Sequence, residues 1–156
     1  MSFEVVKEKV EAALRKLRNQ DSFLIQANTN ERAISHKLAE YLQVEFPMWK
    51  VDCEYNRHGE EIKRLEVPSD NINWDDTEAK TVFPDIIVHQ RNNDDNNLLV
   101  IEIKKSSNAQ SQFDKTKLIA FTKEPYRYKF GLFLKIAMNG TDDSLIWYRN
   151  GRASDE

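Results

Sequence analysis

Two acidic residues and a lysine lie inside stretches that otherwise read as buried strands. Asp85 precedes the apolar run Ile86-Ile87-Val88, and Glu102 and Lys104 follow the apolar run 98–101. Uninterrupted apolar runs are typical of strands covered on both faces, where a charge is costly unless it is paired or binds a ligand. Carboxylates are preferred ligands of Mg²⁺ and Mn²⁺, and an ammonium can stabilise negative charge that develops on an oxygen. These residue types therefore fit metal-assisted hydrolysis of a phosphodiester.

Strand geometry predicts that the three side chains converge. Successive side chains of a strand alternate between its faces, so Glu102 and Lys104 share a face while Lys105 points to the other. The polar stretch 92–97 is rich in Asn and Asp and is typical of a turn. An antiparallel hairpin around that turn places Asp85 opposite the Glu102–Lys104 segment.

The same charges have a simpler interpretation. Asp85 and Glu102 can pair with Lys104 and Lys105 as a structural ion cluster at the end of a strand. An isolated Glu-x-Lys favours that interpretation, because so short a motif occurs by chance in many chains. The Pro84-Asp85 step, the apolar hairpin and the helix expected after it favour a catalytic site instead.

The arrangement resembles the signature of the PD-(D/E)XK nuclease superfamily. Pro84-Asp85 and, across the hairpin, Glu102-Ile103-Lys104 carry the resemblance. The resemblance implies that Asp85, Glu102 and the backbone carbonyl of Ile103 bind Mg²⁺ or Mn²⁺. It also implies that Lys104 orients or deprotonates the attacking water and stabilises the developing negative charge.

Glu31 is a further candidate, and two interpretations of it stay open. It lies at the start of a predicted helix that runs to about Gln43, on the same stripe as Ile34 and Leu38. In the resembled superfamily a glutamate on the first core helix approaches the metal site. Alternatively, Glu31 forms a capping box with Asn28 and favours the positive end of the helix.

The elements that must position these residues follow from hydrophobic periodicity. Predicted helices cover residues 3–17, 31–43 and 109–122. Predicted strands cover residues 49–56, 62–67, 82–90, 98–105, 128–137 and 145–148, with 68–80 as a loop and 151–156 as a frayed tail. The order resembles the restriction-endonuclease-like αβββαβ core, a mixed central sheet flanked by helices, with an extra N-terminal helix. The expected fold class is therefore α/β (α+β).

Several side chains between these elements carry more local expectations. Residues 22–25 read as an apolar connector, and residues 58–61 as the turn of a hairpin between the strands 49–56 and 62–67. Asp52 and Glu54 are expected to face solvent, and His89 to pack or to be hydrogen-bonded. In the third helix the expected packing residues are Phe113, Leu118, Ile119 and Phe121.

Length and composition bound the class of protein. The chain has 156 residues, 40% of them hydrophobic and 31% charged, which suits one globular domain spanning residues 1–156. The single cysteine, Cys53, excludes an internal disulfide and a cysteine-based zinc cage. The N-terminus has no signal-peptide core, and the apolar runs are too short to span a bilayer. We expect a cytoplasmic protein with no membrane partner.

The charge distribution bears on nucleic-acid binding. The formal net charge of −3 argues against it, but residues 104–135 carry eight Lys or Arg residues and only two acids, Asp114 and Glu124. This segment can be a solvated face or a track for the phosphate backbone. The expected backbone contacts are Lys115, Lys117, Lys123 and Arg127.

The sequence thus predicts a metal-dependent nuclease, and the resemblance favours DNA as its substrate. The alternative is a catalytically silent nuclease-like fold that serves as a nucleic-acid-binding or assembly module. A domain of this size leaves little surface for sequence readout. A third alternative is therefore a restriction or repair subunit that is active only when a partner subunit or a second copy supplies specificity.

Overall fold

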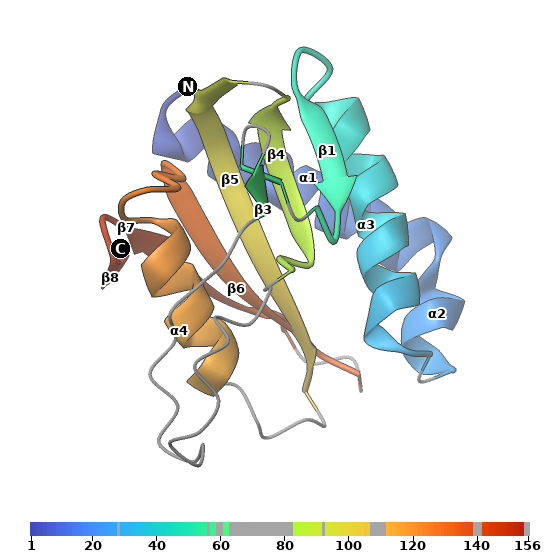
Figure 1. Cartoon of the computed structure of the whole chain (residues 1–156). Coiled ribbons are helices and arrows are strands. Elements are labelled where there is room, and N and C mark those ends of the chain that lie inside the picture. Colours follow the sequence, from blue (N-terminus) through green and yellow to red (C-terminus); the bar gives the residue numbers. More distant parts are fainter. Residues whose placement is uncertain are drawn as a thin grey trace.

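The computed structural model describes residues 1–27, 29–55, 57–58, 61–62, 83–91, 93–106, 112–138 and 142–154. Its helices are α1 (Phe3–Gln20), α2 (Ser22–Gln26), α3 (Glu31–Glu45) and α4 (Gln112–Phe121). Its strands are β1 (Lys50–Cys53), β2 (Arg57–His58), β3 (Glu61–Ile62), β4 (Ile86–Gln90), β5 (Asn93–Lys105), β6 (Phe130–Ile136), β7 (Ser144–Arg149) and β8 (Arg152–Ser154). Figure 1 shows their arrangement.

The centre of the fold is a six-stranded sheet in the order β1-β4-β5-β6-β7-β8. Its neighbours are antiparallel except β5 and β6, which run parallel. Two adjacent parallel strands need a long crossover, and the chain between β5 and β6 contains α4. The strands β2 and β3 form a separate two-stranded ladder.

Helices lie on both faces of the sheet, with α1 behind it and α4 in front in Figure 1. One core cluster joins α1, α2 and α3 to residues such as Ile101, Leu132 and Trp147. A smaller cluster joins α4 to Ile87 and Val100 and to the aromatic residues around it. A mixed sheet flanked by helices confirms the predicted α/β (α+β) class.

The central hairpin forms, but its turn is shorter than the sequence predicts. Ile86 lies opposite Ile101 and Ile87 opposite Val100, as an antiparallel pairing requires. The strand β5 already begins at Asn93, so much of the polar stretch 92–97 belongs to a strand. Register shifts on either side of His89 accommodate these polar residues.

Three predictions about local structure were wrong. The strand expected over 49–56 ends at Cys53, because Glu54 has φ of +48°, and β1 pairs with β4 and not with the next hairpin strand. The apolar connector at 22–25 is the short helix α2. The expected frayed tail contains β8, which pairs with β7 from Trp147 to Arg149.

The side chain of Asp52 also differs from its predicted solvent-facing position. Asp52 Oδ2 lies 2.8 Å from His89 Nε2 and accepts a 3.0 Å hydrogen bond from Arg91 Nε. His89 is buried and its ring lies 4.7 Å from that of Tyr55, which confirms that it is hydrogen-bonded and packed. Glu54, by contrast, is exposed and pairs with Arg32.

The described residues contain no helix long and apolar enough to cross a membrane.

Candidate active site

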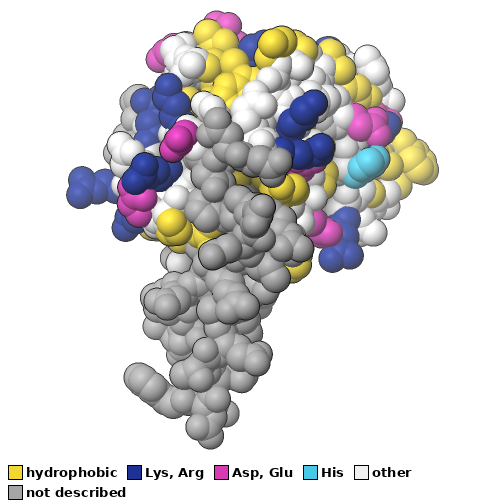
Figure 2. Space-filling model, turned by 45° about the horizontal axis from the view of Figure 1, so that its top comes forward, with side chains coloured by type: hydrophobic (Ala, Val, Ile, Leu, Met, Phe, Trp, Pro, Cys, Tyr) yellow, Lys and Arg dark blue, Asp and Glu magenta, His cyan; other side chains and the backbone are white. Residues whose placement is uncertain are grey.

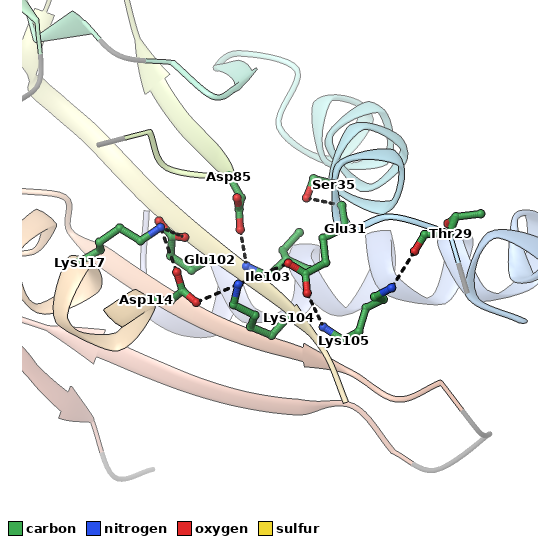
Figure 3. Close-up of polar contacts among 10 residues, drawn as sticks. All are labelled: Thr29, Glu31, Ser35, Asp85, Glu102, Ile103, Lys104, Lys105, Asp114 and Lys117. Carbon is green, nitrogen blue, oxygen red and sulfur yellow. Dashed lines mark hydrogen bonds and ion pairs between the residues drawn. The ribbon is translucent and has the colours of Figure 1, made fainter. Parts of the chain in front are cut away.

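Asp85 stands directly before β4 and is held by both neighbouring strands. The Glu54 N–H donates a 3.2 Å hydrogen bond to the Asp85 carbonyl at the end of β1. On the other side, Asp85 Oδ2 accepts a 2.7 Å hydrogen bond from the Ile103 N–H of β5 (Figure 3). Burial raises the pKa of the Asp85 carboxyl despite this hydrogen bond. Asp85 therefore lies beside the Glu102–Lys104 segment, where the hairpin pairing predicts it.

The hydrogen bond from Ile103 also fixes the direction of its backbone. The N–H and C=O of one strand residue point to the same side of the strand. The Ile103 carbonyl therefore faces the side on which Asp85 lies, next to the start of β4. This direction agrees with the role that the resemblance assigns to the carbonyl.

Glu102 is a fully buried carboxylate, and among the described residues only one of its two oxygens has a hydrogen-bond partner. Its Oε2 accepts a 2.5 Å hydrogen bond from Lys117 Nζ, whereas its Oε1 is buried and has no partner among the described residues. Burial, followed by repulsion from Asp85, raises the pKa of the Glu102 carboxyl well above its usual range. An unsatisfied buried carboxylate oxygen is costly, and this oxygen can accept a hydrogen bond or a cation.

Lys104 lies between carboxylates from two different helices. Its Nζ is 3.4 Å from Glu31 Oε2 of α3 and 3.2 Å from Asp114 Oδ2 of α4. Burial alone lowers the pKa of this ammonium, but Asp114 and Glu31 outweigh that effect and raise it. The Lys104 side chain is therefore positively charged at neutral pH and suits charge stabilisation better than proton abstraction.

The helix α4 supplies two buried charges that the sequence analysis did not place in the site. Asp114 and Lys117 are 7% and 6% exposed, and Lys117 Nζ lies 3.0 Å from Asp114 Oδ1. Together with Leu118 and Phe121 they occupy the helical spacing i, i+3, i+4, i+7, which is the signal that could have found them. Phe113, predicted to pack, is 52% exposed instead.

Glu31 reaches the site from the first turn of α3. Besides its contact with Lys104, its Oε1 accepts a 3.3 Å hydrogen bond from the Lys105 N–H. The N-cap of the helix is Asn30, whose Oδ1 accepts a 2.8 Å hydrogen bond from the Ala33 N–H. The predicted capping box was therefore wrong about the cap, and Asn28 lies outside the described residues. Figure 3 shows Glu31 turned toward the two lysines.

The residue types at the site, although not their present arrangement, suit a hard divalent cation. Asp85, Glu102, Asp114 and Glu31 bring four carboxyl groups against the two ammonium groups of Lys104 and Lys117. Oxygen-rich sites with excess negative charge bind Mg²⁺ and Mn²⁺, and Glu102 Oε1 is a buried oxygen without a partner among the described residues. In the described part of the chain, however, no three His, Cys, Asp or Glu side chains are already arranged to hold a metal ion. The ammonium of Lys117 lies between Glu102 and Asp114.

The expected phosphate-contacting residues do not lie together. Lys117 is buried in the acidic cluster, where its ammonium pairs with Glu102, and not on the surface beside the other three. Lys115 Nζ lies 5.4 Å from the centroid of the Phe133 ring, whereas Lys123 and Arg127 are exposed beyond the end of α4. On the face drawn in Figure 2, basic and acidic side chains are intermixed and do not form a continuous basic stripe.

Lys123 and Arg127 also lie toward the opposite end of the sheet from Lys104. The turn that contains them leads into the start of β6, and the Lys129 N–H donates a 2.9 Å hydrogen bond to the Asn97 carbonyl near the start of β5. Lys104 lies near the end of β5, about seven residues or about 23 Å along an extended strand from Asn97. A nucleic acid would have to extend along the sheet to contact both Lys104 and the turn that contains Lys123 and Arg127.

Comparisons with protein-family models, with curated proteins and with solved structures find no match to this chain. Any statement about its function therefore rests on its own residues and on the short motif described above.

Proposed function

We propose that this protein is a metal-dependent nuclease that hydrolyses phosphodiester bonds, with DNA as its expected substrate. One observation carries the proposal. Asp85, Glu102 and Lys104 meet on one side of the sheet where β4 begins and β5 ends, and Glu102 Oε1 is buried there without a partner among the described residues. A buried carboxylate oxygen with an open acceptor position supports a cation site more than a purely structural ion cluster.

The element order supports the same proposal. From α3 to β6 the six-stranded sheet and its helices follow the order α3-β1-β4-β5-α4-β6, with β5 and β6 parallel. This order resembles the αβββαβ arrangement of the PD-(D/E)XK superfamily. Asp85 directly precedes the second strand of this order, Glu102 and Lys104 lie in the third, and Glu31 begins the first helix.

In this proposal the chain supplies the ligands and a fixed positive charge. Asp85, Glu102 and the Ile103 carbonyl would hold Mg²⁺ or Mn²⁺, which when bound polarises the phosphate and lowers the pKa of a water molecule. Lys104 keeps its proton between Glu31 and Asp114 and stabilises negative charge on the phosphate. Because carboxylates raise the pKa of Lys104, we propose that it orients the attacking water and does not deprotonate it.

A second candidate function is a silent nuclease-like module that binds nucleic acid or assembles with a partner. The observation that favours it is the ion pairing of Glu102 and Asp114 with Lys117, which neutralises part of the acidic cluster without a metal. The two candidates differ in one respect that can be measured. The nuclease cleaves DNA and requires a divalent cation and Lys104 to do so, whereas the silent module cleaves no DNA.

The proposal predicts that Lys104→Met lowers the rate of DNA cleavage by about 10²-fold, because the variant removes a charge that stabilises the transition state. Supercoiled, linear, branched and single-stranded DNA should be incubated with wild type in Mg²⁺, in Mn²⁺ and in EDTA. Lys105→Met is the matched control, since the Lys105 Nζ donates a 3.2 Å hydrogen bond to the Thr29 carbonyl. Cleavage that persists in EDTA, or that falls equally in both variants, would contradict the proposed role of Lys104.

A further inference from the structure

The buried ammonium of Lys117 occupies a specific place in the acidic cluster. It bridges carboxylates from two elements, at 2.5 Å from Glu102 Oε2 of β5 and 3.0 Å from Asp114 Oδ1 of α4. A single ammonium has three donors and one charge, and it leaves Glu102 Oε1 unsatisfied among the described residues. A divalent cation carries twice the charge and takes six or more oxygen ligands.

The ammonium of Lys117 also lies near an aromatic ring. Phe113 lies one turn earlier on the same face of α4, and its ring centroid is 5.5 Å from Lys117 Nζ. This ring is 52% exposed, so it borders solvent and not the core. A lysine ammonium is attracted to the face of an aromatic ring, and its four-carbon stem is flexible. The ammonium can therefore leave Glu102 while α4 stays in place.

We propose that Lys117 is an internal competitor for the divalent cation, and that Asp114 is a further carboxylate of the cation site. In the metal-free protein the Lys117 ammonium holds Glu102 and Asp114 together and limits their repulsion. Cation binding requires the ammonium to withdraw and frees both carboxylates as ligands. This inference rests on the proposed function, because it assumes a cation site at Asp85 and Glu102.

A purely structural role makes a different prediction for the same residues. If the ion pairs serve only to attach α4 to the sheet, removal of Lys117 destabilises the fold and leaves the cation affinity unchanged or weaker. If Lys117 competes with the cation, its removal strengthens cation binding, because part of the binding free energy no longer displaces the ammonium. The sign of the change in affinity therefore separates the two roles.

The experiment measures Mn²⁺ affinity by electron paramagnetic resonance of the free ion, in wild type, Lys117→Met and Asp114→Asn. We expect Lys117→Met to bind Mn²⁺ at least about tenfold more tightly and Asp114→Asn to bind it more weakly. Lys115→Met is the matched control, since it removes the same charge from α4 while Lys115 Nζ lies beside the Phe133 ring. Its affinity should rise much less than that of Lys117→Met.

Thermal unfolding gives a second readout that does not depend on activity. Without metal, Lys117→Met should have a lower Tm than wild type, because Glu102 and Asp114 lose the ammonium that pairs with them. Addition of Mn²⁺ should raise the Tm of Lys117→Met by more than it raises the Tm of wild type. If Lys117→Met folds only with Mn²⁺, Lys117→Gln replaces it in the affinity measurement, and this dependence supports the proposal.

The outcomes separate the failure of this inference from the failure of the proposed function. Suppose that wild type binds Mn²⁺ and Asp85→Asn does not. If Lys117→Met then binds Mn²⁺ no more tightly than Lys115→Met does, the competitor role is overturned and the nuclease proposal stands. If Asp114→Asn binds as wild type does, the role of Asp114 is overturned. If no variant with Asp85 intact binds Mn²⁺, both the inference and the proposed function are overturned.

Discussion

Replacement of Asp85 by asparagine is expected to lower metal-dependent cleavage of DNA by about 10³-fold or more. The substitution removes the charge while keeping the size of the side chain and an oxygen that can accept the 2.7 Å hydrogen bond from the Ile103 N–H. The backbone should stay in register, because the Glu54 N–H binds the carbonyl of residue 85 and not its side chain. The loss would therefore report on the cation and not on the fold.

The matched control for this variant is Asp52→Asn. Asp52 is also a partly buried carboxylate on this sheet, but it pairs with His89 and Arg91. Its replacement should leave the cleavage rate within a few-fold of wild type. Steady-state cleavage with Mg²⁺ and with Mn²⁺ checks both variants, with circular dichroism to verify folding. Equal rates for Asp85→Asn and wild type would remove Asp85 from the mechanism.

Replacement of Phe121 by alanine is expected to cause a large loss of stability, about 3–5 kcal/mol in the free energy of unfolding. Phe121 is fully buried and anchors the end of α4 in the smaller core cluster. Its ring lies 5.4 Å from that of Tyr126 and 6.1 Å from that of Tyr128. The cavity left by alanine would loosen the helix that carries Asp114 and Lys117, so the variant should also lose activity.

Phe113→Ala gives the matched comparison on the same helix. The Phe113 side chain is 52% exposed, so its truncation should change the free energy of unfolding by no more than about 0.5 kcal/mol. Urea unfolding followed by circular dichroism measures both variants. Similar losses for the two phenylalanines would mean that α4 does not pack on the sheet through the face described above.

The parts of the site that sequence analysis could place are those on consecutive strands. Apolar runs and a polar turn predict the hairpin, and strand alternation then predicts where Asp85 lies relative to Glu102. Both steps use only residues that are near one another along the chain. The structure has this pairing, although β5 begins at Asn93, earlier than the strand expected from Leu98.

The contribution of α4 was harder to predict, because it depends on contacts between distant elements. Asp114 and Lys117 look like surface charges until the position of Glu102 is known. Phe113 was among the residues predicted to pack, yet Lys117 takes the buried position beside the carboxylates. A charged residue on a helix can be buried only where another element offers an oppositely charged partner. The hydrophobic pattern of the helix alone carries no information about that partner.

Backbone conformation explains the remaining differences. Glu54 ends β1 with a positive φ, which residues other than glycine adopt infrequently and which hydrophobic patterning does not signal. The strand β8 is only three residues long, and its pairing with β7 follows a turn at Asn150 and Gly151 that also has positive φ values. A short polar segment after such a turn resembles a tail in sequence.

Calorimetric titration of Mn²⁺ tests the central claim most directly, namely that Asp85 and Glu102 form a site for a divalent cation. It should be carried out on wild type, on Asp85→Asn and on Glu102→Gln, with no nucleic acid present. The proposal predicts saturable binding to wild type and at least about tenfold weaker binding to each variant, because each lacks one charged oxygen ligand. Equal affinities in all three proteins, or no binding to wild type, would contradict it.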